Sequence, residues 1–157
     1  MDKKYLLIIL GFFLVLLDQV TKFFMKNVKL DLRFFQFNFV TNTGISFGLF
    51  KGSSLVIIII SCAVLVALYY FREEFKGKNI YLTLIVSGIF GNLIDRLFLG
   101  SVRDFIDFRW WPIFNVADSL LFIGVFGIII TSIIELFKEK KVTSKTGSKK
   151  KLNKAKK

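Results

Sequence analysis

The sequence predicts an all-α membrane protein with four transmembrane helices and a small extracytoplasmic β-cradle between helices 1 and 2. Hydrophobic residues make up 54% of the 157 positions, and the 20 phenylalanines alone outnumber the 11 acidic residues. This composition is too apolar for an ordinary soluble domain. A transmembrane helix needs about 20 mostly apolar residues. Four stretches approach that length, namely residues 5–25, 53–71, 80–99 and 117–137.

The first apolar stretch is similar to a secretory signal, because "DKK" precedes its apolar core. No small-residue cleavage site follows that core, and the helical pattern continues through Asp18 and Lys22. We therefore expect an uncleaved spanning helix. Asp18 and Lys22 are four residues apart and share one helix face, so we expect them to form an ion pair near the membrane interface.

Residues 26–52 connect the first two helices. In the segment "RFFQFNFV", phenylalanines alternate with Gln36 and Asn38. A period of two predicts an extended strand with one aromatic face and one polar face. We expect this strand to belong to a small sheet whose aromatic face rests on lipid or on the helices.

Residues 44–48, "GISFG", match the G-x-S-x-G nucleophile elbow around Ser46. That elbow needs a strand-to-helix turn in an α/β sheet and a partner base, so we assign these glycines to a turn instead. The chain has no histidine, which excludes Ser-His and Cys-His dyads and most zinc sites. The single cysteine, Cys62, lies in mid-span, where a thiol is expected to be inert.

The net charge of +12 is concentrated near the C-terminus, where residues 141–157 are polar, rich in lysine and free of aromatic residues. Such a segment has nothing to bury. We therefore expect residues 1–140 to form the membrane domain and residues 141–157 to form a disordered basic tail. Basic residues favour the cytoplasmic side, which places both termini in the cytoplasm. We assign the tail to topology and to contact with anionic membrane lipid, and not to nucleic acid.

Six aspartates then lie at outer helix ends or in the outer segments: Asp18, Asp31, Asp95, Asp104, Asp107 and Asp118. In the third helix, Asn92, Asp95 and Arg96 share one face, whereas Asp104 lies beyond Gly100. Ionisable groups that face a bundle interior are functional hypotheses. Two carboxylates held close in a poorly solvated pocket share a proton. Aspartic proteases use this arrangement for general acid and general base catalysis on water.

The fourth helix begins at "FNVADS", where Asn115 is a good N-cap and Asp118 falls at the third helical position. The pair predicts a capping box at the positive end of the helix dipole. Capping alone accounts for Asp118 when that residue is considered by itself. A chemical role is the alternative, because several outer carboxylates share one small bundle.

Two other classes of membrane protein also place polar residues among helices. A transporter or channel needs a polar path that continues to the inner face, but residues 55–68 and 120–130 contain no charged residue. A structural anchor with a basic tail leaves the clustering of carboxylates unexplained. A membrane aspartyl hydrolase is the mechanism that the available residues support best.

Four motifs follow one another between residues 18 and 124: "DQVTK", "TNTGISFG", "GIFGNLIDRLFLGSVRDFIDF" and "FNVADSLLFIG". In this order and spacing they resemble the lipoprotein signal peptidase family, also called signal peptidase II, whose members are bacterial membrane aspartyl peptidases. The resemblance implies that Asp104 and Asp118 are the catalytic pair. It also implies a set of residues that bind substrate or support the pair: Asp18, Lys22, Asn42, Gly88, Asn92, Asp95, Arg96, Asn115 and Ala117.

The resemblance implies hydrolysis of the peptide bond just before a diacylglyceryl-modified cysteine, which releases the signal peptide of a prolipoprotein. The reaction is expected at the extracytoplasmic face of the bacterial cytoplasmic membrane. The aromatic strand would clamp the substrate, and the cyclic peptide globomycin would occupy the same groove. The family implies no metal and no organic cofactor. We expect a monomer.

Four residues depart from the pattern of several relatives, which have glycine in place of Ser87, small hydrophobic residues in place of Ile45 and Ser46, and valine in place of Arg103. Ser87 still permits close helix packing. Ile45 and Arg103 are expected near the substrate path, where they would affect the preference for lipid or signal sequence. The interval of fourteen residues between Asp104 and Asp118 is short for the family and leaves less room for an extracellular helix.

Overall fold

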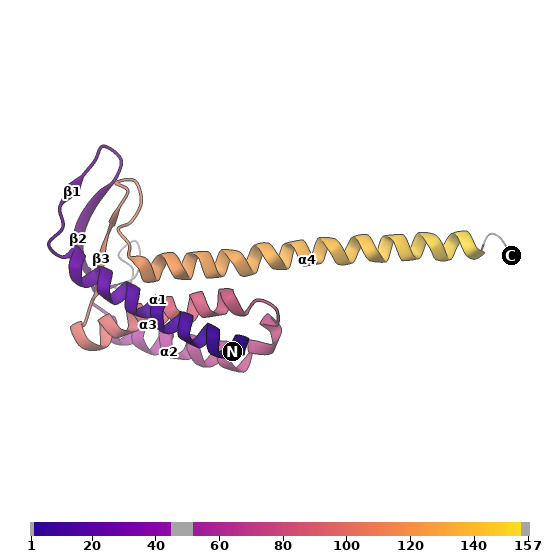
Figure 1. Ribbon diagram of the computed structural model, residues 1–157, viewed down its shortest axis with the longest axis horizontal. Helices are drawn as coiled ribbons and strands as arrows, with labels where there is room; N and C mark the ends of the chain where they lie inside the picture. The colour runs from indigo at the N-terminus through magenta and orange to yellow at the C-terminus, as the bar shows by residue number, and fades with distance from the viewer. Residues whose placement is uncertain (1, 45–51, 155–157) are drawn as a thin grey trace. The chain divides into compact units, whose positions relative to one another are not determined.

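The computed structural model describes residues 2–44 and 52–154, with side chains as far as residue 138 and at residue 140 (Figure 1). The helices are α1 (Lys3–Met25), α2 (Ser54–Tyr70), α3 (Asn79–Leu99) and α4 (Val116–Lys154), and a short 3-10 helix, η2 (Arg72–Phe75), follows α2. The strands are β1 (Leu30–Asp31), β2 (Gln36–Asn42) and β3 (Val102–Asp107). The chain divides into two compact units, Met1–Val125 and Phe126–Lys157.

Within the described residues, three helical segments are long and apolar enough to cross a membrane. They are α1, α3 and the first part of α4, Val116–Lys138. The fourth apolar helix, α2, has 17 residues and is shorter than the other three. Each of the four predicted helices is therefore present within one or two residues of its predicted start, and three of them qualify as spans by length and composition.

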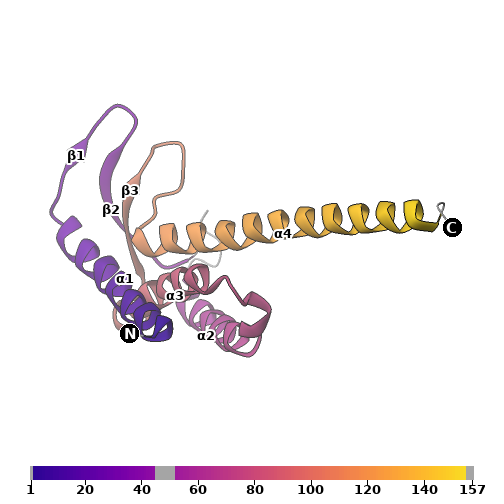
Figure 2. The ribbon, with the colours of Figure 1, turned by 45° about the vertical axis from the view of Figure 1, so that its right-hand side comes forward.

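The central helix of the first unit is α3, because both α1 and α2 pack against it (Figure 2). Half of its apolar stretch is buried, compared with 11% for α1. Small residues bring α1 close to α3, since Gly11 faces Thr83 and Ser87. The Ser87 hydroxyl donates a hydrogen bond to the carbonyl oxygen of Thr83 (2.7 Å) and approaches that of Gly11 (3.3 Å). Ser87 is thus compatible with close packing, as expected.

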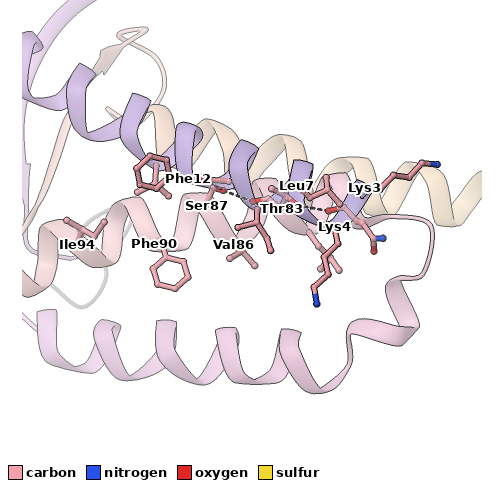
Figure 3. A pocket seen from close by; sticks show the side chains of 14 residues that line it. Lys3, Lys4, Leu7, Phe12, Thr83, Val86, Ser87, Phe90 and Ile94 are labelled. Atoms are coloured by element: carbon pink, nitrogen blue, oxygen red, sulfur yellow. Dashed lines mark hydrogen bonds between the residues drawn. The ribbon is translucent and has the colours of Figure 1, made fainter. Parts of the chain in front are cut away.

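An apolar groove of about 660 Å³ lies between α1 and α3 (Figure 3). Phe12, Val86 and Phe90 line it, and Lys3 and Lys4 belong to its lining near the start of α1. The lining contains no acidic side chain. The groove is therefore suited to apolar chains, and the carboxylate chemistry predicted from the sequence must lie elsewhere.

The first turns of α4 approach α3 through glycines. A Cβ added at Gly88 would lie 2.4 Å from the carbonyl oxygen of Ala117 and 2.7 Å from the side chain of Leu121. Ala117 is fully buried, and a Cβ at Gly91 would lie 2.6 Å from the carboxylate of Asp18. Gly88 and Ala117, the two small positions predicted beside the site, thus face each other across this contact.

The sheet has three antiparallel strands in the order β1-β2-β3. It lies at the end of α1 and α3 that is away from the N-terminus (Figures 1 and 2). Val40 pairs with Asp104 and Thr41 with Arg103. The predicted cradle between helices 1 and 2 is therefore incomplete, because its third strand comes from between α3 and α4. Pairing between distant segments leaves little local mark in a sequence, which is why β3 was missed.

Aromatic rings cover the strands. The ring centroids of Phe37 and Phe105 are 6.3 Å apart, and those of Phe35 and Phe108 are 5.4 Å apart. Beyond β3, the side chain of Trp110 is 77% exposed. The sheet therefore carries the aromatic face that the period-two pattern predicts, next to exposed tryptophan of the kind found at membrane interfaces.

Two predictions fall wholly or partly outside the described residues. The first concerns Ile45 and Ser46 of the G-x-S-x-G match, because residues 45–51 are not described. The other is the tail, since the backbone of α4 continues to Lys154 but no side chain of residues 141–157 is described. The boundary at residue 140 and the disordered tail stay predictions.

The contact at Gly88 gives a first testable prediction. Gly88→Ala places a methyl group against backbone and should lower the free energy of unfolding by about 1–3 kcal/mol. Gly11→Ala is the matched control, because its methyl group would meet atoms at 3.4 Å, an ordinary contact distance. Thermal unfolding in detergent should show a lower midpoint for the first variant only. Equal midpoints for the two variants would contradict the close approach of α3 and α4.

Candidate active site

A buried polar cluster lies where α1, α3, β3 and the start of α4 meet. Its buried members are Asp18, Lys22, Asn92, Asp95, Arg96, Asp104 and Asn115, and Asp118 beside them is half-buried. All of these residues belong to the set predicted from the sequence. Buried polar groups are costly unless they find partners, so the hydrogen bonds of this cluster determine its geometry.

Lys22 lies at the centre of the cluster, with no exposed side-chain surface. Its ammonium is 2.8 Å from the carboxylate of Asp18 and 3.4 Å from that of Asp95. The ion pair predicted within the first helix is therefore confirmed. It is fully buried, however, because α3 supplies a second carboxylate that covers it.

Lys22 also donates a hydrogen bond to Oδ1 of Asn92 (3.0 Å). An ammonium group only donates, so this contact fixes which end of the Asn92 amide is the oxygen. The amide nitrogen of Asn92 consequently points to Asp118 and donates to its Oδ1 (2.8 Å). A cation on α1 thereby orients a carboxylate on α4 through one amide on α3.

The start of α4 forms the predicted capping box. The backbone N–H of Asp118 donates to Oδ1 of Asn115 (2.9 Å), and the backbone N–H of Asn115 donates to Oδ2 of Asp118 (3.2 Å). The two residues satisfy each other's backbone donors, as expected for such a box. Asp118 thus receives hydrogen bonds on both carboxylate oxygens, one from the cap and one from Asn92.

Asp104 on β3 is held by two amides. Asn115 donates from Nδ2 to its Oδ1 (2.6 Å), and Asn42 of β2 donates to its Oδ2 (3.1 Å). The Nδ2 group of Asn115 also lies 3.0 Å from Oδ1 of Asn92. Asn115 therefore links both carboxyl groups, because its side chain binds Asp104 while its backbone binds Asp118.

Burial and, second, the negative charge of Asp118 together raise the pKa of Asp104 to about 7, although the hydrogen bonds from Asn42 and Asn115 oppose the shift. A carboxyl group with this pKa retains a proton at neutral pH for much of the time. Because the two carboxyl groups interact, the proton belongs to the pair and not to one residue alone. The site can therefore present a carboxylic acid and a carboxylate together.

Arg96 brings a second buried cation to the cluster. Its Nη2 donates to the carbonyl oxygen of Gly44 (2.9 Å), and its charge interacts with those of Asp104 and Asp118. Its buried Nε is the one buried side-chain polar atom without a hydrogen-bond partner among the described residues. A buried guanidinium with a spare donor suits a carbonyl or carboxylate of a ligand.

Gln19 and Arg103 belong to the same network, although the sequence did not single out Gln19 and placed Arg103 near the substrate path. The Arg103 guanidinium lies on Asp95, with Nη2 at 2.7 Å from its Oδ1, and also donates to Oε1 of Gln19 (2.8 Å). Gln19 follows Asp18 in "DQVTK", which is the only local signal that could have revealed it.

The remaining outer aspartates make other contacts. Asp107 accepts hydrogen bonds from Gln36 (2.5 Å) and Asn38 (3.2 Å), which fastens β3 to β2. Asp31 on β1 forms an ion pair with Arg109. Within the part of the chain that the structure describes, no group of three or more histidine, cysteine or acidic residues is arranged to hold a metal ion.

The chain has similar sequences among known proteins. A family model described as "Signal peptidase (SPase) II" matches residues 10–134. The chain is 36% identical over 142 residues to the lipoprotein signal peptidase of Caldanaerobacter subterraneus subsp. tengcongensis, covering 83% of this chain and 96% of the relative. It is 39% identical over 140 residues to that of Fusobacterium nucleatum, covering 80% and 85%.

A solved bacterial membrane enzyme, determined by the in meso method at 2.3 Å resolution, has a similar fold. The TM-score is 0.76 at 32% sequence identity, and the match covers 85% of this chain and 90% of that enzyme. The agreement therefore extends from the motifs to most of the architecture.

The burial of Lys22 gives a second testable prediction. Lys22→Met keeps the length of the side chain but leaves two buried carboxylates without this cation. Breaking a buried pair in this way should lower the free energy of unfolding by about 3–5 kcal/mol. Lys29→Met, at an exposed position, is the control. Thermal unfolding midpoints in detergent should differ clearly, and a Lys22→Met protein as stable as the control would refute the buried network.

Proposed function

The chain belongs to the signal peptidase II family, and from this membership we propose that it removes signal peptides from prolipoproteins with Asp104 and Asp118 as an aspartic catalytic pair. The observation that carries the proposal is the shared contact with Asn115, which holds both carboxyl groups in one buried cluster. The raised pKa of Asp104 supports it further, because the pair can then hold one proton at neutral pH.

The reaction follows from this protonation state. The ionised carboxylate takes a proton from water as the water oxygen attacks the scissile carbonyl carbon, and the protonated carboxyl donates its proton to the carbonyl oxygen. The resulting tetrahedral diol collapses as the carboxyl that took the water proton passes it to the leaving amine nitrogen, the other carboxylate takes a proton from a diol hydroxyl, and the C–N bond breaks. The pair then again holds one proton and one negative charge.

Neighbouring side chains hold the pair in place for these transfers. Asn92 and the capping box bind Asp118, while Asn42 and Asn115 bind Asp104. Each carboxylate oxygen thus has a fixed donor, which limits rotation of the reacting groups. Asp18, Lys22, Asp95 and Arg96 support this layer, and Gly88 and Ala117 allow the helices to approach.

The proposed substrate is a diacylglyceryl-modified prolipoprotein, which is cleaved just before the lipidated cysteine. The aromatic sheet beside the cluster suits a lipid-bearing peptide that arrives laterally from the bilayer. The buried Nε of Arg96 has no hydrogen-bond partner among the described residues, and we propose that it donates to a backbone carbonyl of that peptide when the substrate is bound. We expect globomycin-type cyclic peptides to compete for this position, and we expect neither a metal nor an organic cofactor.

In the membrane we propose four spanning helices. α2 has 17 residues and is about 25 Å long, so it would cross a hydrocarbon core of about 30 Å with local thinning of the bilayer. The positive-inside rule places both termini in the cytoplasm and the aspartates at the extracytoplasmic face. Residues 1–140 form the peptidase domain of a monomer, and residues 141–157 form a cytoplasmic basic tail that touches anionic lipid.

Two substitutions test the catalytic pair. Asp104→Asn and Asp118→Asn each remove one proton-transfer group and should lower signal-peptide release from a diacylglyceryl-modified prolipoprotein by at least about a thousandfold. Asp31→Asn, an exposed aspartate on β1, should keep wild-type activity. The assay uses purified protein in detergent, with thermal unfolding to confirm folding. Full activity in either of the first two variants would reject the assignment.

The protonation state gives a prediction about pH. Because burial and the charge of Asp118 raise the pKa of Asp104 to about 7, the pair loses its shared proton as the pH rises through that region. The rate of cleavage should therefore fall on the alkaline side with an apparent pKa near 7. Measurement of kcat/KM between pH 5 and 9 checks this, provided that the protein stays folded throughout. A constant rate up to pH 9 would contradict it.

A further inference from the structure

Arg103 immediately precedes Asp104 on β3, and its side chain contacts Asp95 and Gln19. We propose that Arg103 is a positioning residue that sets the place and the protonation of the catalytic pair through Asp95. This inference rests on the proposed function of the pair. It concerns a residue outside the set of site residues that the resemblance implies.

The first support is geometric. Arg103 binds Asp95 through three donors: its backbone N–H (2.9 Å), its Nε (3.1 Å) and its Nη2 (2.7 Å). Asp95 has no exposed side-chain surface. A bidentate pair between guanidinium and carboxylate allows little freedom of orientation. Because backbone and side chain of Arg103 are both fixed, the adjacent Asp104 has a fixed backbone from which to reach Asn115.

The second support is the balance of charge in the cluster. α1 contributes Asp18 and Lys22, α3 contributes Asp95 and Arg96, β3 contributes Arg103 and Asp104, and α4 contributes Asp118. These are four carboxyl groups and three cations. When the catalytic pair holds one proton, three negative and three positive charges remain, so the cluster is neutral in the form that the reaction requires. Loss of Arg103 leaves one negative charge in excess, which favours protonation of the pair.

The third support is the position of Lys22. Its ammonium lies nearer to Asp18 than to Asp95, 2.8 Å against 3.4 Å, while it donates to Asn92. Arg103 supplies Asp95 with its principal cation. Without Arg103, Asp95 would draw Lys22 toward itself and away from Asn92. The Asn92 amide, and with it Asp118, would lose the contact that orients it.

A direct contact between Arg103 and substrate is the alternative role, and the two roles differ in their kinetic effects. A residue that binds substrate mainly changes KM, whereas a residue that acts through the pair changes kcat and the pH profile. The Nε and Nη2 donors of Arg103 already engage Asp95 and Gln19. The structure therefore favours the role through the pair.

The test compares Arg103→Leu, Asp95→Asn and the double variant Asp95→Asn/Arg103→Leu, with Arg103→Lys as the conservative change. Each is assayed on a diacylglyceryl-modified prolipoprotein across the pH range. Arg103→Leu should lower kcat by about tenfold to a hundredfold with little change in KM, and the alkaline limb of the profile should move to higher pH. In the double variant, which has no excess charge, the alkaline limb of the pH profile should lie near its wild-type position.

The outcomes separate this inference from the proposed function. If the wild-type protein releases no signal peptide from this substrate, the proposed function fails. If the wild type is active and Arg103→Leu has the same kcat and pH profile, only the positioning role is overturned. A loss confined to KM would also overturn it. If Arg103→Leu does not fold, two other variants decide. Arg103→Lys, which keeps the charge, and the double variant, which has no excess charge, should both be active with the wild-type alkaline limb, and a shifted limb in either would overturn the inference.

Discussion

The structure of the site depends on one buried ammonium group. Lys22 contacts two carboxylates and one amide and has no access to solvent. Only such partners offset the free-energy cost of removing an ammonium group from water. Its contacts with Asp95 and Asn92 join α1 to α3, and its hydrogen bond determines the orientation of the Asn92 amide. The position of Asp118 then follows, because Asn92 and the cap of α4 share its two oxygens. The order of the site thus starts at Lys22.

Local patterns in the sequence were sufficient for much of the fold. Apolar runs of spanning length predicted the four helices, and the capping box of Asn115 and Asp118 was readable because it involves only four consecutive residues. The alternation around Gln36 and Asn38 predicted β2. These features depend on contacts between near neighbours in the chain, for which periodicity and residue type are direct indicators.

The missed features depend on contacts between distant segments. β3 joins the sheet only through its pairing with β2, and the full burial of Lys22 requires Asp95 from another helix. Arg103 was expected near the substrate path, and the sequence did not indicate its pairing with Asp95, because side-chain direction on a strand follows the pairing and the bend of the sheet. The motifs supplied the names of most site residues. They could not supply the connections among them, which run through Gln19, Asn92 and Asn115.

The pairing of Asp18 with Lys22 on consecutive turns of α1 also has a consequence for biosynthesis. The chain emerges from its N-terminus, so α1 reaches the membrane before α3 and its Asp95 exist. A lone charge in the middle of an inserting helix is strongly unfavourable, but opposite charges four residues apart neutralise each other within the same segment. The first helix therefore carries its own counterion during insertion. When α3 packs against α1, Asp95 joins the pair of Asp18 and Lys22 and completes the buried cluster.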